Sequence, residues 1–503
     1  MKSQFLPLFF LSLFLSSCIT AQKGSQTYSS KGYEIKVKID NYDQDTIVLG
    51  YRLGSKTYVR DTAIGKDNKG FFTLKRDTIL EGGVYLILTR PNNNYFEFLI
   101  SGPEEQKLVI STKIEGNDMV KNLKIEGSAD NKAFIDYLHF LSQKSKESES
   151  YNKRALELDS LIKSAQASET QKKTWGEEKS KNLEVLQNMS KEVEQYQKNM
   201  TLSQPKFLST KLILSAQQPN IPKEIEAQGQ MQAYLYFKSR YWDNFDWSDM
   251  RMVRTPIFEN KMEYYLDKLT VQSADSCIIS CDYILGQVLK AGSKEMYQFA
   301  AAHILNKYAA SKVICMDKVY VHVGDKYYCG MIKPEWIDSA QLEKICENAN
   351  DLRYSLCGNQ APEIELTNIE TNQKVKLSSL RSRFVAVYFW DPTCGNCTKN
   401  SKKLVPVYEK WKSKGLEIYG ICSKPIEEVE ECKKKIEEVG MKWLNTSDKA
   451  YPLAVIKKLY DVKMNPFLYL LDIDRKIMFK RIDPDQVDEI LTRELEMLEK
   501  KNK

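Results

Sequence analysis

Residues 33–127 alternate apolar and polar positions with the period of two that is typical of β-strands. Turn-forming segments at 41–45, 67–70, 81–83 and 91–94 separate the apolar runs. The predicted strands are Tyr33–Ile39, Thr46–Leu49, Gly70–Leu74, Tyr85–Leu88, Tyr95–Ile100 and Leu108–Ile110. Short strands at this spacing predict a β-sandwich over residues 28–127. It contains no catalytic cluster, so we interpret it as a structural or binding module.

At Gly127–Ser128 the apolar period changes from two to about 3.6, which indicates helix. Two long amphipathic stretches follow, separated by the polar segment 164–173. Their apolar positions are Phe134, Leu138 and Leu141 in the first, and Leu183, Leu186, Met189, Val193, Tyr196 and Met200 in the second. The pattern predicts a long helical hairpin over residues 128–204. Its narrow apolar stripe either pairs within the chain or makes a homodimer, and the sequence leaves both alternatives open.

Residues 205–358 have a fuller apolar content and predict a helical domain. The predicted helices are Phe207–Leu214, Met231–Trp242, Tyr264–Val271, Ile284–Leu289, Phe299–Tyr308 and Leu342–Leu352. Aromatic residues gather between Tyr234 and Trp247, where they form either a binding surface or part of the core. We favour the core, because aromatic side chains at helical spacing usually pack inside.

The last segment, 359–503, alternates strands and helices. Phe384–Trp390 is almost wholly apolar, as expected for a strand buried on both faces. Further predicted elements are a helix at Thr398–Trp411, a strand at Leu416–Ile421, a helix at Ile426–Val439, strands at Phe467–Leu471 and near Lys476–Lys480, and a helix from Gln486. The order is βαβα followed by ββα, which predicts an α/β fold. The fold class is therefore multidomain: β-sandwich, central all-α region and C-terminal α/β domain.

The first 21 residues have the layout of a secretory signal peptide: Lys2, an apolar run from Phe5 to Leu15, and small residues. The apolar run is too short to span a bilayer. Leu15–Cys18 is similar to a bacterial lipobox, with Cys18 as the lipidated residue, whereas 19–21 is similar to an ordinary cleavage site. Both alternatives export the chain to the periplasm, one of them with a lipid anchor in a membrane. Export places the other cysteines in an oxidising compartment.

Composition narrows the candidate functions. The 503 residues carry a formal net charge of +7, which is small beside 74 basic residues and argues against a nucleic-acid partner. Histidines number three, at 139, 303 and 322, and lie far apart, which disfavours His-rich metal sites and His-based triads; no metal and no cofactor are expected. Cysteines number eleven. Cys315, Cys329, Cys346 and Cys357 are candidates for disulfides of unknown pairing, with a four-cysteine zinc site as the weaker alternative.

The strand Phe384–Trp390 leads directly into Cys394-Gly395-Asn396-Cys397. A helix N-terminus favours a thiolate through its free N–H groups and its dipole, so Cys394 is predicted to be the exposed, reactive sulfur. Cys397, one turn further, is within reach to resolve a mixed disulfide. Zinc knuckles also use this spacing, but no second pair lies nearby, so we interpret the pair as a redox dithiol.

Residues 361–500 resemble a thioredoxin-like domain of the TlpA-like thiol-disulfide oxidoreductases. The resemblance rests on Ala361–Leu366, on the segment Phe389–Cys397 and on Asn465-Pro466-Phe467. It implies that Cys394 and Cys397 are catalytic and that Pro466 is a cis-proline facing them. It also implies substrate contacts, assigned to Trp390, Asp391, Pro392, Asn465 and Pro466.

Two departures from this family concern the acid that assists the buried cysteine. Thioredoxin has an aspartate at the position of Tyr388, and some relatives have a glutamate at the position of Asn400. The proton acceptor of Cys397 is therefore not predicted. Peroxiredoxins have a threonine at the position of Asp391, which disfavours a peroxidase. Cys422 and Cys432 are interpreted as packed thiols, with a third redox group as the alternative.

The sequence thus favours an exported thiol-disulfide oxidoreductase that reduces or isomerises protein disulfides. Its expected partners are exported proteins with thiols or disulfides and a membrane thiol reductant that restores the dithiol. The competing hypothesis is an anchored periplasmic binding or assembly protein, in which the redox domain is auxiliary or vestigial.

Overall fold

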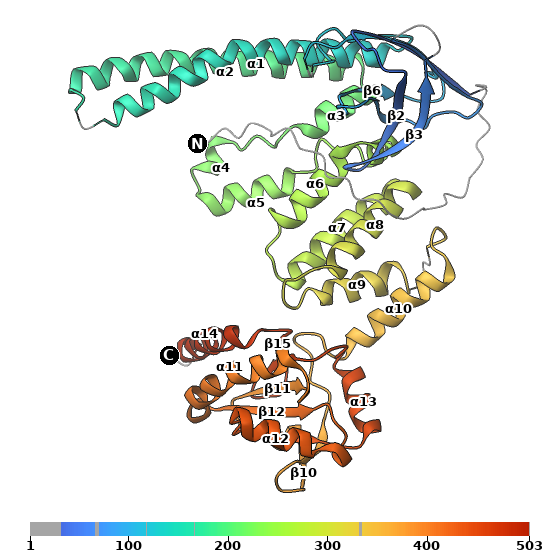
Figure 1. Ribbon diagram of the computed structural model, residues 1–503. Helices are drawn as coiled ribbons and strands as arrows, with labels where there is room; N and C mark the ends of the chain where they lie inside the picture. Colours follow the sequence, from blue (N-terminus) through green and yellow to red (C-terminus); the bar gives the residue numbers. More distant parts are fainter. Residues whose placement is uncertain (1–31, 66–69, 117, 165, 331–333, 502–503) are drawn as a thin grey trace.

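The computed structural model describes residues 32–65, 70–116, 118–164, 166–330 and 334–501. The signal segment with Cys18 lies outside these residues. Figure 1 shows strands and a long helical hairpin at one end, a group of helices in the middle, and an α/β domain at the other end. None of the described helices is long and apolar enough to cross a membrane.

The N-terminal strands form two sheets that pack face to face. One sheet has the order β4-β1-β7-β8 and the other the order β3-β2-β5-β6. The strands are β1 (Tyr33–Asp40), β2 (Thr46–Leu53), β3 (Lys56–Ile64), β4 (Phe71–Arg76), β5 (Gly83–Thr89), β6 (Tyr95–Ile100), β7 (Lys107–Lys113) and β8 (Lys124–Glu126). Alternate residues of β1, such as Ile35 and Val37, enter one core with Ile47 and Ile87 of the opposite sheet. The predicted β-sandwich is confirmed.

Two long helices, α1 (Ala129–Ile162) and α2 (Glu169–Ser203), form the hairpin and extend away from the sandwich in Figure 1. Ser128 caps α1 by accepting from the Asn131 N–H, and Ser168 caps α2 in a capping box with Gln171. Ion pairs join the helices, including Arg154 with Glu178 at 2.8 Å and Lys144 with Glu192 at 2.6 Å. The two helices therefore pair within the chain, and Tyr196 of the apolar stripe stacks on Phe140 of α1. A homodimer through the hairpin stays a prediction.

The central region is helical, as expected. Its elements are α3 (Leu208–Ala216), α4 (Lys223–Glu226), α5 (Gln230–Arg240), η1 (Met250–Arg254), α6 (Pro256–Asp267), α7 (Ala274–Ala291), α8 (Lys294–Ala309), α9 (Asp317–Tyr327) and α10 (Ser339–Arg353). Tyr241, Trp242 and Phe245 are buried in the core, where Phe245 stacks on Phe258 and meets Trp242 edge to face. Tyr234, Phe237 and Trp247 are partly buried and pack against the same core. Asp130, at the start of α1, is fully buried and accepts hydrogen bonds from the backbone N–H groups of Leu208 and Ser209, which ties the hairpin to α3.

Disulfides hold the junction between the helical region and the C-terminal domain. Cys315, just before α9, is bonded to Cys357, which precedes the α/β domain, with a Cα–Cα distance of 5.6 Å. Cys329 is bonded to Cys346 with a Cα–Cα distance of 5.7 Å. These pairings confirm the disulfide interpretation, and they leave no thiolate on the four sulfurs for zinc. Beside the junction, Lys480 is buried in an ion pair with Asp317.

The C-terminal domain is built on one mixed sheet with the order β10-β9-β13-β12-β11-β14-β15. Its strands are β9 (Glu365–Asn368), β10 (Lys374–Lys376), β11 (Phe384–Trp390), β12 (Leu416–Cys422), β13 (Leu444–Ser447), β14 (Phe467–Leu471) and β15 (Ile477–Lys480). Its helices are η2 (Leu377–Ser379), α11 (Gly395–Trp411), η3 (Lys412–Lys414), η4 (Ile426–Glu428), α12 (Glu430–Val439), α13 (Ala450–Leu459) and α14 (Pro484–Lys501). The predicted order therefore lacked β9, β10, β13 and α13.

β11 lies inside the sheet, parallel to β12 and antiparallel to β14, and is buried along its whole length. Ala386, Tyr388 and Trp390 face the core that also contains residues of α11, α12 and α14. Val387 and Phe389 face the other core, against α13. This alternation, which follows from the period of two, decides which side chains of β11 lie beneath the cysteine pair.

Candidate active site

The cysteine pair lies where β11 ends and α11 begins. Cys394 is the N-cap residue of α11, with an extended backbone, and its Sγ accepts a hydrogen bond from the Cys397 N–H at 3.1 Å. Both cysteines are free thiols, and Cys394 is partly exposed. A sulfur at this position receives a helix N–H and the positive end of the helix dipole, which stabilise a thiolate.

Cys397, in the first turn of α11, is 1 % exposed. Burial raises the pKa of its thiol from 9.0 to about 12, and the neighbouring Cys394 adds to the rise. The two sulfurs therefore have different surroundings. One is accessible and accepts a helix N–H, and the other is shielded and favours the thiol form, as a nucleophile and a resolving group require.

The segment before β14 faces the pair from across the site. The Asn465–Pro466 peptide bond is cis, as the resemblance implied. The Cys394 thiol lies 3.8 Å from the Asn465 carbonyl oxygen. The Asn465 side chain donates to Ser423 Oγ at the end of β12. Asn465 and Pro466 are both partly exposed, so a substrate near Cys394 can reach them.

Asp391 and Pro392 form the turn between β11 and Cys394. Asp391 is partly exposed, and its carboxylate accepts from the Thr393 N–H at 2.9 Å and from the Thr393 hydroxyl at 2.6 Å. Pro392 is buried. Lys457 of α13 lies near this carboxylate: burial lowers the pKa of Lys457, and the charge of Asp391 opposes that shift. A contact of Asp391 or Pro392 with substrate stays a prediction.

Trp390 does not fit the predicted substrate contact. Its side chain is 0 % exposed and packs in the core shared by β11 and α11. It is the last residue of a strand that is covered on both faces, so its ring supports the site from below. We therefore correct its role from substrate contact to packing.

Tyr388 and Ser401 are also next to the pair, and the sequence indicated only the first of them, as a departure from the family. The Tyr388 hydroxyl donates to the Cys397 carbonyl oxygen at 3.1 Å and shares a hydrogen bond of 3.0 Å with Ser401 Oγ. Ser401 stands four residues after Cys397, on the same face of α11. The spacing of four residues was the signal in the sequence that could have indicated Ser401 as a neighbour of the cysteine pair.

Cys422 and Cys432 form a disulfide, so the interpretation as packed thiols was wrong. Cys422 ends β12 opposite Trp390, and Cys432 lies on α12. Both are 0 % exposed. The bond closes a short loop next to the active-site strand. Because both cysteines are buried, their sulfurs have no accessible surface.

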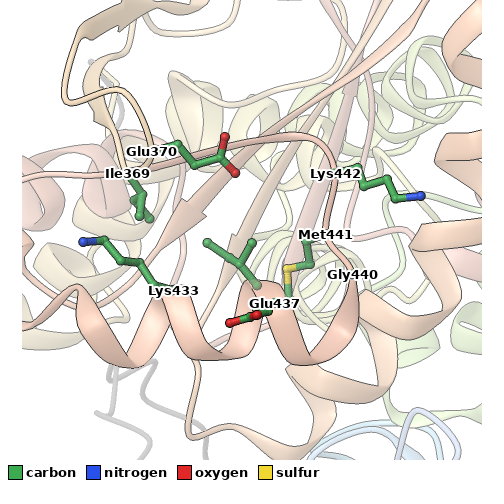
Figure 2. Close-up of a pocket in the computed structure, with 8 residues that line it drawn as sticks. Ile369, Glu370, Lys433, Glu437, Gly440, Met441 and Lys442 are labelled. Atoms are coloured by element: carbon green, nitrogen blue, oxygen red, sulfur yellow. The ribbon is translucent and has the colours of Figure 1, made fainter.

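Two hollows lie away from the cysteines. One, of about 360 Å³, is lined by residues of the β9–β10 turn, of α12 and of the segment that follows α12, namely Ile369, Glu370, Lys433, Ile436, Glu437, Gly440, Met441 and Lys442 (Figure 2). It directly precedes β13, so it lies at the edge where the parallel strands begin, whereas Cys394 lies where β11 ends. Another, of about 430 Å³, lies between α10 and α13. In the residues the structure describes, no group of His, Cys, Asp and Glu is arranged to hold a metal ion.

Comparisons with known protein families divide the chain at the same junction. Residues 357–480 match the family model described as "AhpC/TSA family". Residues 166–355 match a "Domain of unknown function (DUF5106)", which spans α2 to α10.

Individual relatives match a quarter to about half of the chain. The thiol-disulfide oxidoreductase ResA of Bacillus cereus is 28% identical over 131 residues, which are 25% of this chain and 69% of that protein. Among solved structures, a thioredoxin-like protein from Bacteroides caccae is 20% identical and covers 55% of this chain and 97% of its own, with a TM-score of 0.43. The thioredoxin domain of a thiol-disulfide oxidoreductase from Bacteroides vulgatus is 26% identical and covers 27% of this chain and 96% of its own, with a TM-score of 0.26.

The family match and the named relatives agree with the placement of a free cysteine pair at the junction of a buried strand and a helix. Residues 357–480 are thus a thioredoxin-like domain of the AhpC/TSA family, and the chain that carries it is an oxidoreductase enzyme of the thiol-disulfide kind.

Proposed function

We propose that the chain is an exported thiol-disulfide oxidoreductase that reduces or isomerises disulfides in other exported proteins through Cys394 and Cys397. The observation that carries the proposal is the Cys394 sulfur itself. It is partly exposed, receives the Cys397 N–H at 3.1 Å and faces the carbonyl of the cis Asn465–Pro466 bond. A substrate backbone can pair with groups at such a site while its disulfide meets the nucleophile.

The reaction proceeds in two exchanges. The Cys394 thiolate attacks one sulfur of the client disulfide, forms a mixed disulfide and releases one client thiolate. Cys397 then loses its proton and attacks Cys394, which releases the second client sulfur as a thiolate. Two electrons pass to the client, and the pair becomes a disulfide. A membrane thiol reductant must return two electrons before the next cycle.

Export is supported by the disulfides elsewhere in the chain. Cys315–Cys357, Cys329–Cys346 and Cys422–Cys432 are bonded, as is usual in oxidising compartments and rare in the bacterial cytosol. We further propose that Cys18 is lipidated and anchors the chain to a membrane facing the periplasm. In a Cys18→Ser variant the protein should move from the membrane fraction to the soluble fraction. An unchanged distribution, with a mature N-terminus at Gln22, would favour ordinary cleavage.

Trapping separates catalysis from a purely assembling role. In the native compartment, Cys397→Ala should accumulate mixed disulfides between Cys394 and client proteins, because the resolving sulfur is missing. The matched control is the double variant Cys394→Ser with Cys397→Ala, which should trap none. If Cys397→Ala captures no covalent partner while stable non-covalent partners co-purify, the chain is an assembly protein with an auxiliary redox domain. Unchanged disulfide reduction by Cys394→Ser would also refute the proposal.

A further inference from the structure

A buried hydrogen-bonded pair lies directly beneath the resolving cysteine. Tyr388 of β11 and Ser401 of α11 are both 0 % exposed. The Tyr388 hydroxyl has a single proton, which it donates to the Cys397 carbonyl oxygen at 3.1 Å. Ser401 Oγ, 3.0 Å from the same hydroxyl, is then the donor of the second bond. These two hydrogen bonds, from Ser401 to Tyr388 and from Tyr388 to Cys397, connect the first turn of α11 to the central strand β11.

No carboxylate occupies this place among the residues the structure describes around Cys397. The charge of Asp391 bears on Cys397, but the Asp391 carboxylate is engaged by the Thr393 N–H and hydroxyl. Lys457 faces Asp391 from α13, and Cys394 is the other titratable neighbour. Tyr388 is therefore the polar side chain that bonds directly to the resolving residue from below.

The contact acts on the turn that carries both sulfurs. Residues 394 to 398 are linked by the Cys397 N–H bond to Cys394 Sγ and by the Thr398 N–H bond to the Cys394 carbonyl. The Tyr388 hydroxyl donates a hydrogen bond to the Cys397 carbonyl oxygen, at the other end of this turn. A displacement of about 1 Å between a nucleophile and its target costs roughly a hundredfold in rate. The attack of Cys397 on Cys394 is the step that depends on this geometry.

We propose that Tyr388 and Ser401 are positioning residues for the second exchange: they hold the first turn of α11 so that Cys397 Sγ can attack Cys394 Sγ. In that step a new Cys397–Cys394 bond forms and the bond from Cys394 to the client breaks. The proton of Cys397 goes to solvent, and the client leaves as a thiolate. This inference rests on the proposed function but concerns only its second half.

The test uses the full-length chain and a small chromogenic disulfide, 5,5′-dithiobis(2-nitrobenzoate). Attack by Cys394 releases one thionitrobenzoate, and attack by Cys397 on the resulting adduct releases a second. Tyr388→Phe, which removes only the hydroxyl, should leave the first phase within about twofold and slow the second by roughly tenfold. Ser401→Ala should also slow the second phase. If Tyr388→Phe does not fold, the result for Ser401→Ala decides whether the pair has a positioning role.

Tyr419→Phe is the matched control. Tyr419 is equally buried, in the neighbouring strand β12, and its hydroxyl donates to the Val375 carbonyl at 2.8 Å, in the core on the opposite face of the sheet. It should change neither phase. An unaltered second phase in Tyr388→Phe, or equal slowing in Tyr388→Phe and Tyr419→Phe, overturns the positioning role. If the unmodified chain shows no first phase, the dithiol is unreactive, and the proposed function fails with it.

Discussion

The pH dependence of the second exchange can be derived from the burial of Cys397. The thiolate is the attacking species, so the rate of this step follows the deprotonated fraction of Cys397. In the dithiol, burial and then Cys394 raise the pKa from 9.0 to about 12. That rise corresponds to roughly 4 kcal/mol of extra cost for deprotonation.

In the mixed disulfide the contribution of Cys394 disappears, because that sulfur carries neither charge nor proton. Burial, the largest cause, remains, since Cys397 is still covered. The pKa therefore stays above 9.0, and below it the thiolate fraction grows tenfold per pH unit. From pH 7 to pH 9 the second phase should accelerate roughly a hundredfold.

Stopped-flow release of thionitrobenzoate between pH 7 and pH 9 measures this directly. Cys277 and Cys281 are fully buried and should not contribute, and a Cys18→Ser background excludes any contribution from position 18. Cys397→Ala, which lacks the second phase, is the control for slow background release. A plateau below pH 8 would show that Cys397 ionises more readily than its burial allows and would refute the reasoning.

Further predictions concern stability and can be measured by denaturant unfolding of the full chain. Asp130→Asn should cost roughly 2–4 kcal/mol, because a buried carboxylate that accepts from Ser101 Oγ at 2.6 Å and from two backbone N–H groups loses its charge; a loss below about 1 kcal/mol would contradict this. The double variant Cys422→Ala with Cys432→Ala should cost about 3 kcal/mol, from the closure entropy of a loop with a sequence separation of 10, and an unchanged transition would disprove it. Lys480→Met should cost roughly 3–5 kcal/mol by leaving the Asp317 carboxylate, which is 13% exposed, without its partner, whereas Lys480→Met with Asp317→Leu should cost much less; equal losses would exclude the ion pair as the cause.

Much of the fold could be predicted where the apolar pattern has one clear period. The strand Phe384–Trp390 and the hairpin helices are of this kind. The strand β3 was missed because it is an edge strand with mostly exposed residues, so its alternation is weak. The strand β13 was missed because its buried positions are filled by Asn445, Thr446 and Ser447, which hydrogen-bond inside the sheet. The helix α9 was missed because its run of Val and Tyr suits a strand equally well.

The site was predictable where local spacing decides geometry, and the family resemblance added the cis Asn465–Pro466 bond. A cap at Cys394 and a buried Cys397 one turn later follow from the strand-to-helix junction and the spacing of the two cysteines. The bond between Cys422 and Cys432 depends on how α12 packs on β12, which no local pattern records. The contact of Ser401 with Tyr388 requires that Tyr388 points toward α11. That orientation is set by the register of β11 in the sheet. Trp390 was misassigned because a family motif places it beside the cysteines in sequence, while its strand buries it.

The disulfides at the junction also determine the covalent topology of the chain. Cys329–Cys346 lies wholly inside the interval closed by Cys315–Cys357, so the two bonds form nested rings. A single peptide-bond cleavage anywhere within the outer ring opens it without detaching the catalytic domain from the rest of the molecule. Separation into two fragments then requires a reductant as well as a protease, so a nicked molecule migrates as one species until its disulfides are reduced.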